Sequence, residues 1–374
     1  MDNKKGCRSE YYLRGRRKVF TAIVVCIVAS TQLNLSGGKN IKLFIYNEIV
    51  IEGGVYAGWR SSDYGLQREM PPSYWVDAAE RMASKFPDSQ PGGIWILGVV
   101  LDDGSCHLQF PSPAGGYYPN IDFESADINE EYLDAFDVAG VKIWLQVESG
   151  NADIETLIDL VLIRYKHHSS VIGFGIDVEW REPEKYHNGR KVTNEEATTW
   201  LNRIKSYDPN YKLFLKHWLV EKMPTIRPGG LVFIDDSQDF DSLNDLANSF
   251  KQWGSHFYPS GVGFQIGYRR DKNWWVWLED PFGDIGNALL EDILNCVGIY
   301  WVDFTILEVF APEVLAADLN KDGIVSIVDI FIVARAYGTM PEDPNWNQIA
   351  DLNNDEAINI QDITIVAREY GKTV

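Results

Sequence analysis

Two carboxylates near the middle of the chain are the residues best placed to carry chemistry. Asp177 and Glu179 are separated by a single valine and follow a glycine-rich apolar run. Two carboxylates that share one poorly solvated strand end repel each other, so one of them keeps its proton to higher pH, as a general acid must. The alternative interpretation is a buried structural acid that is satisfied by Arg181 or Lys216.

Other polar and aromatic residues fall near the ends of neighbouring apolar runs. Glu148 follows the third run and Asp236 follows the sixth, and both are further catalytic candidates. The chain has 13 tryptophans, and flat aromatic rings can stack on sugar faces. The expected substrate-binding residues are Trp59, Trp144, Gln146, Trp180, Gln265 and Trp301.

Eight short apolar segments must position these residues. The expected strands are Gly54–Trp59, Ile94–Leu101, Val141–Glu148, Val171–Trp180, Lys212–Trp218, Leu231–Asp236, Val262–Tyr268 and Val297–Phe304. Amphipathic helical patterns lie between many of them, at Ser73–Lys85, Asn129–Val138, Ile154–Tyr165, Glu195–Ile204, Ser242–Trp253 and Ile285–Leu294. This alternation predicts an α/β fold, a (β/α)₈ TIM barrel, with a doubly wound sheet as the alternative. The stretch from 212 to 236 fits least well, because its connection is short and rich in proline.

The alternation of side chains along a strand predicts which residues face inward. In the fourth expected strand the helix-facing residues are Ile172, Phe174, Ile176 and Val178. The inward set is Gly173, Gly175, Asp177 and Glu179. Both carboxylates therefore point to the interior at the carboxyl end of the strand, where barrel enzymes keep their chemistry.

These segments resemble parts of known glycoside hydrolase barrels. The phrase Gly175-Ile-Asp177-Val-Glu179-Trp resembles the fourth-strand signature of chitinase-type and muramidase-type enzymes. Gly54–Trp59 is similar to their first strand, and Gly298–Asp303 is similar to the last strand of chitinases. Chitinases end their motif in a glutamate two residues further on, where this chain has Arg181, so the shorter muramidase-like motif is the closer match.

The resemblance implies roles for these acids. Glu179 would protonate the glycosidic oxygen, and Asp177 would orient a 2-acetamido group or stabilise the positive charge of the transition state. With a neutral sugar, Glu148 or Asp236 would instead be the nucleophile or base. The resemblance implies a polysaccharide substrate whose sugars are N-acetylated, as for the chitinase-type and muramidase-type enzymes.

The last part of the chain repeats an acidic loop. Asp318–Asp329 and Asp351–Asp362 both carry Asp, Asn or Ser at loop positions 1, 3, 5, 9 and 12, and each runs into a helical pattern. Short loops with oxygen donors at these positions bind calcium. The alternative is a repeated acidic turn without metal.

An aspartate at position 12 and one helix after each loop make the repeat similar to type I dockerins, which dock enzymes onto cohesin-bearing partners. The resemblance implies two Ca²⁺ ions. The ligands of the first would be Asp318, Asn320, Asp322, Ser326, Asp329 and the carbonyl of Ile324. The ligands of the second would be Asp351, Asn353, Asp355, Asn359, Asp362 and the carbonyl of Ala357. Glu356 replaces the usual glycine at position 6, so the second site is expected to bind more weakly.

The N-terminus indicates export. Basic residues at 14–18 precede an apolar run at 19–29 that is too short to cross a bilayer comfortably. We therefore expect a signal peptide at 1–30, a flexible segment at 31–45, the barrel at 46–310, a linker at 311–316 and the calcium module at 317–374. No stable membrane span is expected, although an uncleaved anchor is the alternative. Cys106 and Cys296, which follow the leader, form no evident disulfide framework.

Together these features predict a secreted or cell-surface protein that cleaves O-glycosidic bonds. The net charge of −20 argues against a nucleic-acid partner. The expected partners are a glycan and a cohesin-like protein, with docking onto the protein's own barrel as the alternative for the module. A rival function is a non-catalytic glycan-binding or assembly protein, whose long loops at 103–128 or 269–284 would plug the barrel mouth.

Overall fold

The computed structural model describes residues 54–182, 188–312 and 315–372. The expected signal peptide and flexible segment, the first eight residues assigned to the barrel and part of the linker lie outside the described residues. The barrel and the C-terminal module are described separately below.

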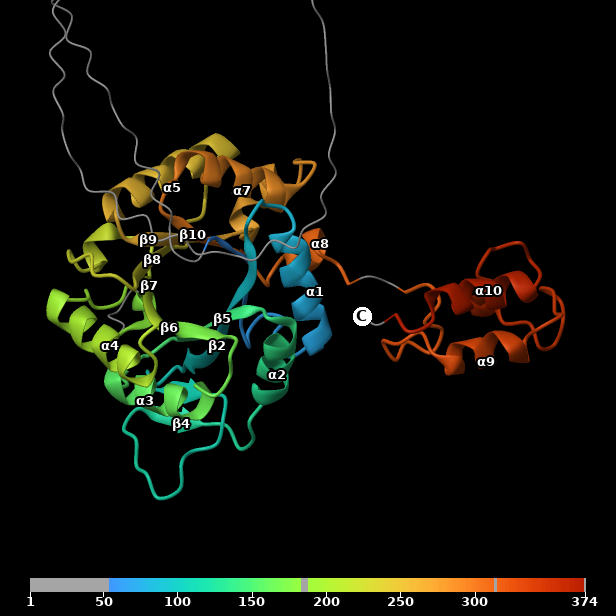
Figure 1. The fold of residues 1–374 in the computed structure, drawn as a ribbon, viewed down its shortest axis with the longest axis horizontal. Coiled ribbons are helices and arrows are strands. Elements are labelled where there is room, and N and C mark those ends of the chain that lie inside the picture. Colours follow the sequence, from blue (N-terminus) through green and yellow to red (C-terminus); the bar gives the residue numbers. More distant parts are fainter. Residues whose placement is uncertain (1–53, 183–187, 313–314, 373–374) are drawn as a thin grey trace, which may run out of the picture. The chain divides into compact units, whose positions relative to one another are not determined.

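Eight parallel strands close into a barrel (Figure 1). Its strands are β1 (Tyr56–Ser61), β2 (Gln90–Val100), β5 (Lys142–Val147), β6 (Val171–Asp177), β7 (Lys212–Lys216), β8 (Leu231–Asp235), β9 (Gly261–Ile266) and β10 (Cys296–Val302). Each strand pairs with the next one in this order, and β1 pairs with both β2 and β10, which closes the sheet. The predicted TIM-barrel architecture is confirmed, and all eight strands lie where the apolar runs placed them.

Helices surround the barrel. They are α1 (Pro72–Ala83), α2 (Glu130–Ala139), α3 (Ile154–Tyr165), α4 (Asn194–Tyr207), α5 (Leu243–Phe257), α6 (Lys272–Trp275), α7 (Pro281–Asp292) and α8 (Ile306–Val309). Between β7 and β8 only the short 3-10 helix η2 (Val220–Lys222) is found in the described chain, as the short proline-rich connection suggested. The loop after β2 adds two short strands, β3 (Cys106–Leu108) and β4 (Ile121–Phe123), which were not predicted.

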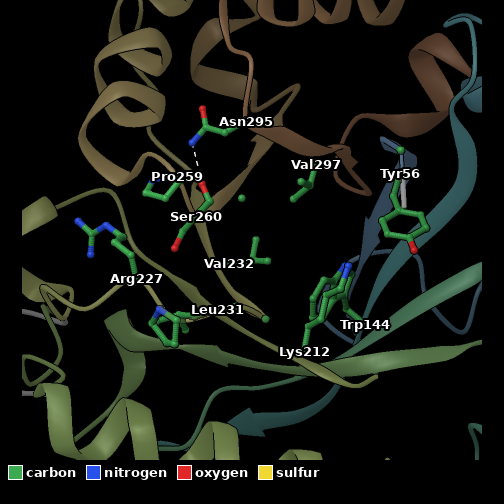
Figure 2. A pocket seen from close by; sticks show the side chains of 15 residues that line it. Tyr56, Trp144, Lys212, Arg227, Leu231, Val232, Pro259, Ser260, Asn295 and Val297 are labelled. Atoms are coloured by element: carbon green, nitrogen blue, oxygen red, sulfur yellow. Dashed lines mark hydrogen bonds between the residues drawn. The ribbon is translucent and has the colours of Figure 1, made fainter. Parts of the chain in front are cut away.

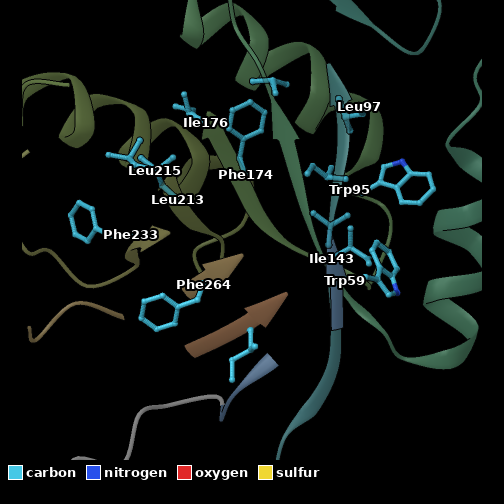
Figure 3. Close-up of a cluster of buried hydrophobic side chains, with 14 of the residues drawn as sticks. Trp59, Trp95, Leu97, Ile143, Phe174, Ile176, Leu213, Leu215, Phe233 and Phe264 are labelled. Carbon is cyan, nitrogen blue, oxygen red and sulfur yellow. The ribbon is translucent and has the colours of Figure 1, made fainter. Parts of the chain in front are cut away.

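The barrel has two layers of buried side chains. The larger layer lies between the sheet and the helices and includes Phe174, Ile176 and Ile143 (Figure 3). The barrel interior is filled by Ile94, Ile96, Trp144, Phe214, Val232, Ile234 and Tyr300. Each fully buried large apolar side chain contributes about 1.5–3 kcal/mol.

The predicted alternation in β6 is confirmed for Phe174 and Ile176 but not for Ile172. Ile172 packs against the interior cluster instead of the helices. The pairing of β5 and β6 shifts register at this point, which turns the side chain inward. The upper half of the strand, which carries Asp177, keeps the predicted phase.

The C-terminal module has a small core of its own. Helices α9 (Ile327–Arg335) and α10 (Ile360–Glu369) pack against each other, and the 3-10 helix η4 (Gln348–Ala350) lies between them in sequence. The buried residues are Ala317, Val325, Val333, Ala336, Ala350, Ile358 and Val366. Such a small core leaves much of the folding free energy to be supplied by other interactions.

Two further observations concern the described chain as a whole. Cys106 and Cys296 are both buried and both free. None of the helices within residues 54–182, 188–312 and 315–372 combines the length and hydrophobicity that a bilayer crossing requires.

Candidate active site at the barrel mouth

A cavity of about 720 Å³ opens at the carboxyl ends of the barrel strands. Its lining includes the four predicted catalytic residues, which come from the ends of three strands: Glu148 after β5, Asp177 and Glu179 at the end of β6, and Asp236 after β8. Parallel strands bring their carboxyl ends to one edge of the sheet, so residues distant in sequence meet there. The structure therefore brings together the acids that the sequence singled out.

Glu179 does not lie on the strand itself. Strand β6 ends at Asp177, and Glu179 follows in the 3-10 helix η1 (Val178–Trp180). The Asp177 carboxylate Oδ1 accepts a hydrogen bond of 3.2 Å from the Glu179 backbone N–H, which caps this turn. The prediction of a strand through Trp180 is wrong at its end, because Asp177 caps the turn and terminates the strand. Both carboxylates still reach the cavity.

Lys216 is the cation of the site. It lies opposite Asp177 in the pairing of β6 with β7, and its Nζ is 2.8 Å from Asp177 Oδ2. The same Nζ is 2.5 Å from Asp236 Oδ2 and 3.7 Å from Glu179 Oε2. Arg181, the other candidate partner of the acids, pairs with Glu196 instead. One buried ammonium group thus faces three carboxylates.

Burial and mutual repulsion give these groups different protonation preferences. Burial raises the pKa of Glu179 to about 7, aided by Asp236 and Glu148 and opposed by Lys216. Burial also raises the pKa of Asp177, and there too Lys216 opposes the change. Burial alone would lower the pKa of Lys216, but Asp177 and Asp236 outweigh it and hold the ammonium charged. Glu179, the most accessible of the three acids around Lys216, has the pKa of a group that can give up a proton near neutral pH.

Glu148 is held by groups that the sequence did not point to. Its Oε1 accepts a hydrogen bond of 2.5 Å from the Tyr64 hydroxyl, and its Oε2 accepts one of 3.3 Å from the Val100 N–H. The Arg60 guanidinium donates to the Tyr64 oxygen and pairs with buried Asp303 at 3.2 Å. Tyr64 lies in the loop after β1, where no periodic pattern marks it.

The two predicted glutamines lie beneath the cavity and do not line it. Gln146 Nε2 is 3.5 Å from Asp177 Oδ2. Gln265 Oε1 accepts a hydrogen bond of 3.0 Å from the Tyr268 hydroxyl, and Tyr268 does line the cavity. Both glutamines are fully buried, so their contacts support site residues from below.

Trp180 is the one predicted tryptophan that lines the cavity. The predicted substrate-binding role of Trp59 and Trp301 is wrong, because both side chains are fully buried in the layer that faces the helices. Trp59 packs on Trp75, and the Trp301 Nε1 donates to Thr305. The side chains of Trp59 and Trp301 therefore face the helices, whereas the prediction placed them on the inward faces of their strands.

Trp144 faces the interior as predicted but lies too deep to meet a substrate at the mouth. Its Nε1 donates to the Tyr300 hydroxyl at 3.1 Å within the interior cluster. It also borders a second cavity of about 410 Å³ at the amino ends of the strands, which Figure 2 shows with Lys212 and Arg227. The described lining of that cavity contains no Asp, Glu or His, so it lacks an acid–base pair.

The two acidic loops of the C-terminal module fold in the same way. Asp318 Oδ2 accepts the N–H of Gly323 at 2.8 Å, and Asp351 Oδ2 accepts the N–H of Glu356 at 3.0 Å. Glu356 has a φ of 63°, the left-handed conformation that Gly323 adopts at the equivalent position with a φ of 84°. The predicted strained conformation of Glu356 is therefore confirmed, at a cost on the order of 1 kcal/mol.

The last aspartate of each loop ties the loop to its helix. Buried Asp329 accepts hydrogen bonds from the N–H groups of Leu319 and Ser326, at 2.8 and 2.7 Å. Asp362 accepts the N–H groups of Leu352 and Asn359, at 2.9 and 2.8 Å. Burial raises the pKa of Asp329, but these backbone hydrogen bonds outweigh it and hold the pKa low. The first loop therefore keeps an ionised carboxylate at its base.

Residues 316–369 match the family model of the dockerin type I domain. The C-terminal module is a type I dockerin. Among solved structures, it is similar to a type II cohesin-dockerin domain from Bacteroides cellolosolvens, with 42% identity over 16% of this chain and 90% of that chain and a TM-score of 0.14. A cohesin-X-dockerin complex from Acetivibrio cellulolyticus matches with 36% identity over 14% of this chain and 33% of that chain, at a TM-score of 0.14.

The barrel is similar to solved structures with which it shares little sequence identity. A broad-specificity GH5-4 endoglucanase from an uncultured bacterium covers 66% of this chain and 86% of its own, with 10% identity and a TM-score of 0.40. A similarity at this level says nothing of activity or substrate. No curated protein matches the chain.

The dockerin loops fit the calcium that dockerin domains bind. Their side chains supply carboxylate, amide and hydroxyl oxygens, which are the donors of a hard cation. In the first loop Asn320 and Asp322 already lie together, with Asn320 Nδ2 2.7 Å from Asp322 Oδ2, and the second loop repeats this contact between Asn353 and Asp355 at 2.8 Å. The donor set is therefore gathered in both loops.

Proposed function

We propose that the protein is a glycoside hydrolase that cleaves O-glycosidic bonds of a polysaccharide at the barrel mouth, and that its dockerin attaches it to a cohesin-bearing partner. The observation that carries the enzymatic part is Glu179. Its carboxyl group lines an open cavity, and burial raises its pKa to about 7. A protonated carboxyl group in contact with solvent-accessible space is what a leaving glycosidic oxygen requires.

The second group of the reaction is Asp236. Lys216 Nζ lies 2.5 Å from its Oδ2, and its Oδ1 has no hydrogen-bond partner among the described residues. Because Asp236 borders the cavity and the protein does not engage this oxygen, we assign Asp236 as the nucleophile. Asp177 is less suited to attack, because both of its carboxylate oxygens are engaged, by Lys216, Gln146 and the N–H of Glu179.

The separation of the two acids favours retention of configuration. Glu179 Oε2 and Asp236 Oδ2 lie 3.7 and 2.5 Å from the same Lys216 Nζ, so they cannot be far apart. Retaining enzymes hold their carboxyl groups about 5–5.5 Å apart, whereas inverting enzymes need about 6.5–9.5 Å to admit a water. With an N-acetylated sugar, Asp177 would orient the 2-acetamido group, and that route also retains configuration.

The open cavity favours the enzyme over the binding or assembly protein. A plugged mouth would support the latter, yet the cavity reaches both Asp177 and Glu179. Of the long loop after β2, only its first four residues, 101–104, border the cavity, and no described residue from 269 to 284 does so.

For the dockerin we propose two calcium ions. Each would be held by its own loop: Asp318, Asn320, Asp322, Ser326, Asp329 and the carbonyl of Ile324 in the first, and Asp351, Asn353, Asp355, Asn359, Asp362 and the carbonyl of Ala357 in the second. The ions would neutralise the gathered carboxylates and stabilise the small core.

A cohesin would bind the exposed apolar residues at the start of the two helices. Ile327, Val328 and Ile360 are 64%, 46% and 60% exposed, which is unusual for such large apolar side chains unless a partner covers them. We therefore also propose that the protein works outside the cell, secreted or at the cell surface. The enzymatic proposal is tested by hydrolysis of a glycan panel, comparing the wild-type chain with Glu179→Gln, as set out at the end of the Discussion.

A further inference from the structure

Two adjacent histidines and a glutamate converge on one point of the barrel surface, away from the mouth. His167 and His168 lie in the turn between α3 and β6, and Glu130 is the first residue of α2. The His168 Nε2 is 3.0 Å from Glu130 Oε2, and the His167 Nε2 is 3.6 Å from the same oxygen. Each of these residues offers one ligand atom, and the three atoms all lie within 4.8 Å of one another. From these contacts we infer a binding site for a divalent transition metal of the zinc type, held by His167, His168 and Glu130.

The spacing of the three atoms suits such an ion. Zinc binds imidazole nitrogen and carboxylate oxygen at about 2.0–2.2 Å in tetrahedral geometry, which separates neighbouring ligand atoms by about 3.3–3.6 Å. The observed separations of 3.0 and 3.6 Å bracket this range. At 3.6 Å the His167 contact is too long for a hydrogen bond, so hydrogen bonding alone does not account for its approach to Glu130.

The surroundings of His168 match those of a metal-bound histidine. Its Nδ1 is 2.9 Å from Asp137 Oδ2, and this carboxylate is fixed in turn by the N–H of Ser170 at 2.6 Å. Histidines that bind metals usually give their second ring N–H to a carboxylate, which fixes the tautomer and aims the other nitrogen at the ion. The His168 ring is 1% exposed, so its orientation is set by packing.

The exposure of the three residues leaves room for the ion and for water. The side chains of His167 and Glu130 are 58% and 39% exposed, so the site opens to solvent on one side. Two histidines and one carboxylate leave the fourth tetrahedral position to water. Calcium prefers oxygen ligands, so it fits a site with two imidazoles poorly. It fits the dockerin loops well, because their ligands are oxygens. A bound ion would clamp the start of α2 to the turn before β6.

The test uses the untagged full-length chain saturated with calcium, titrated with Zn²⁺ in competition with a chromophoric chelator and with Co²⁺ as an absorbing substitute. We expect one Zn²⁺ per chain beyond the calcium, and a visible Co²⁺ spectrum of tetrahedral type. His167→Ala, an exposed change that leaves the fold intact, should weaken Zn²⁺ binding at least about 100-fold. Asp137→Asn should weaken it roughly 10–100-fold through His168.

His256→Ala is the matched control, because His256 is an exposed histidine in the last turn of α5, remote in sequence from the cluster. It should bind Zn²⁺ as the wild type does. The inference is overturned if the wild type binds no Zn²⁺ at micromolar concentrations, or if His167→Ala binds it with unchanged affinity. Thermal unfolding without metal, which we expect to be the same for wild type and His167→Ala, separates loss of a ligand from loss of structure.

Discussion

The ammonium group of Lys216 lies 2.5 Å from the carboxylate of Asp236, and both side chains are almost completely buried at the base of the barrel mouth. Lys216 also contacts Asp177 and approaches Glu179, so one positive charge serves three acids. The acid at the longest distance, Glu179, is the one whose pKa rises to about 7. The lysine thus lies closest to the two most buried acids, Asp177 and Asp236, and farthest from Glu179, the acid that is most accessible at the cavity.

Removing this lysine should destabilise the barrel strongly. Lys216→Met leaves Asp177 and Asp236 buried without their cation, and breaking a buried ion pair in this way costs about 3–5 kcal/mol. Lys251→Met is the matched control, because Lys251 pairs with Asp292 on the surface and such pairs contribute about 0–1 kcal/mol. The free energy of unfolding from urea titration, followed by barrel tryptophan fluorescence, distinguishes them. Equal losses in the two variants would show that Lys216 is not a buried charge partner.

The dependence of activity on pH should follow Glu179. A general acid works in its protonated form, so kcat/KM should fall as pH rises through about 7, the pKa of Glu179. Glu148 contributes to this raised pKa, so Glu148→Gln should move the alkaline limb to lower pH. The measurement is a pH profile of kcat/KM for both proteins. An alkaline limb at the same pH in both would mean that Glu148 does not act on the proton donor.

The products should keep the anomeric configuration of the substrate. Glu179 Oε2 and Asp236 Oδ2 lie 3.7 and 2.5 Å from the same Lys216 Nζ, and this shared contact favours the short carboxyl separation of a retaining mechanism. Proton NMR of the first products, recorded before mutarotation, reports the configuration directly. An inverted anomer at early times would rule out a nucleophilic Asp236.

Removal of calcium should unfold the dockerin and spare the barrel. The described dockerin core has seven buried apolar residues, and its loops hold clustered carboxylates that repel one another without a cation. Heteronuclear NMR of the full chain with excess chelator should lose the dispersed signals of residues 315–372 and keep those of the barrel. Dockerin signals unaffected by the chelator would contradict the calcium assignment.

The sequence predicted most of the fold because most strands follow the expected alternation. In β5 and upper β6, apolar residues alternate with glycine or polar residues, so the helix-facing and inward sets were separable and Asp177 was placed correctly. The helix-like connections were equally clear. The three-residue strands β3 and β4 were missed, because so short a segment has no periodicity to recognise.

The site was predicted less completely, for physical reasons. Strands β1 and β10 carry large residues on both faces, so their sequence pattern did not indicate that Trp59 and Trp301 face the helices. Trp144 faces inward, but depth within the barrel depends on strand stagger, which one sequence does not reveal. Tyr64 and Tyr268 reach the cavity from loops, where side-chain direction depends on tertiary contacts. Lys216 was recognisable only as a partner for the acids.

The most direct test of the account is hydrolysis of a glycan panel that includes chitin oligomers, peptidoglycan, β-glucans and xylan. The calcium-loaded wild type is compared with Glu179→Gln and with Glu221→Gln, the same change at an exposed glutamate in η2 that does not border the cavity. We predict that the wild type and Glu221→Gln cleave at least one substrate equally well, and that Glu179→Gln is at least ~100-fold slower. Equal turnover by all three proteins, or no cleavage of any glycan by the folded wild type, would contradict the assignment of Glu179 as the general acid of a glycoside hydrolase.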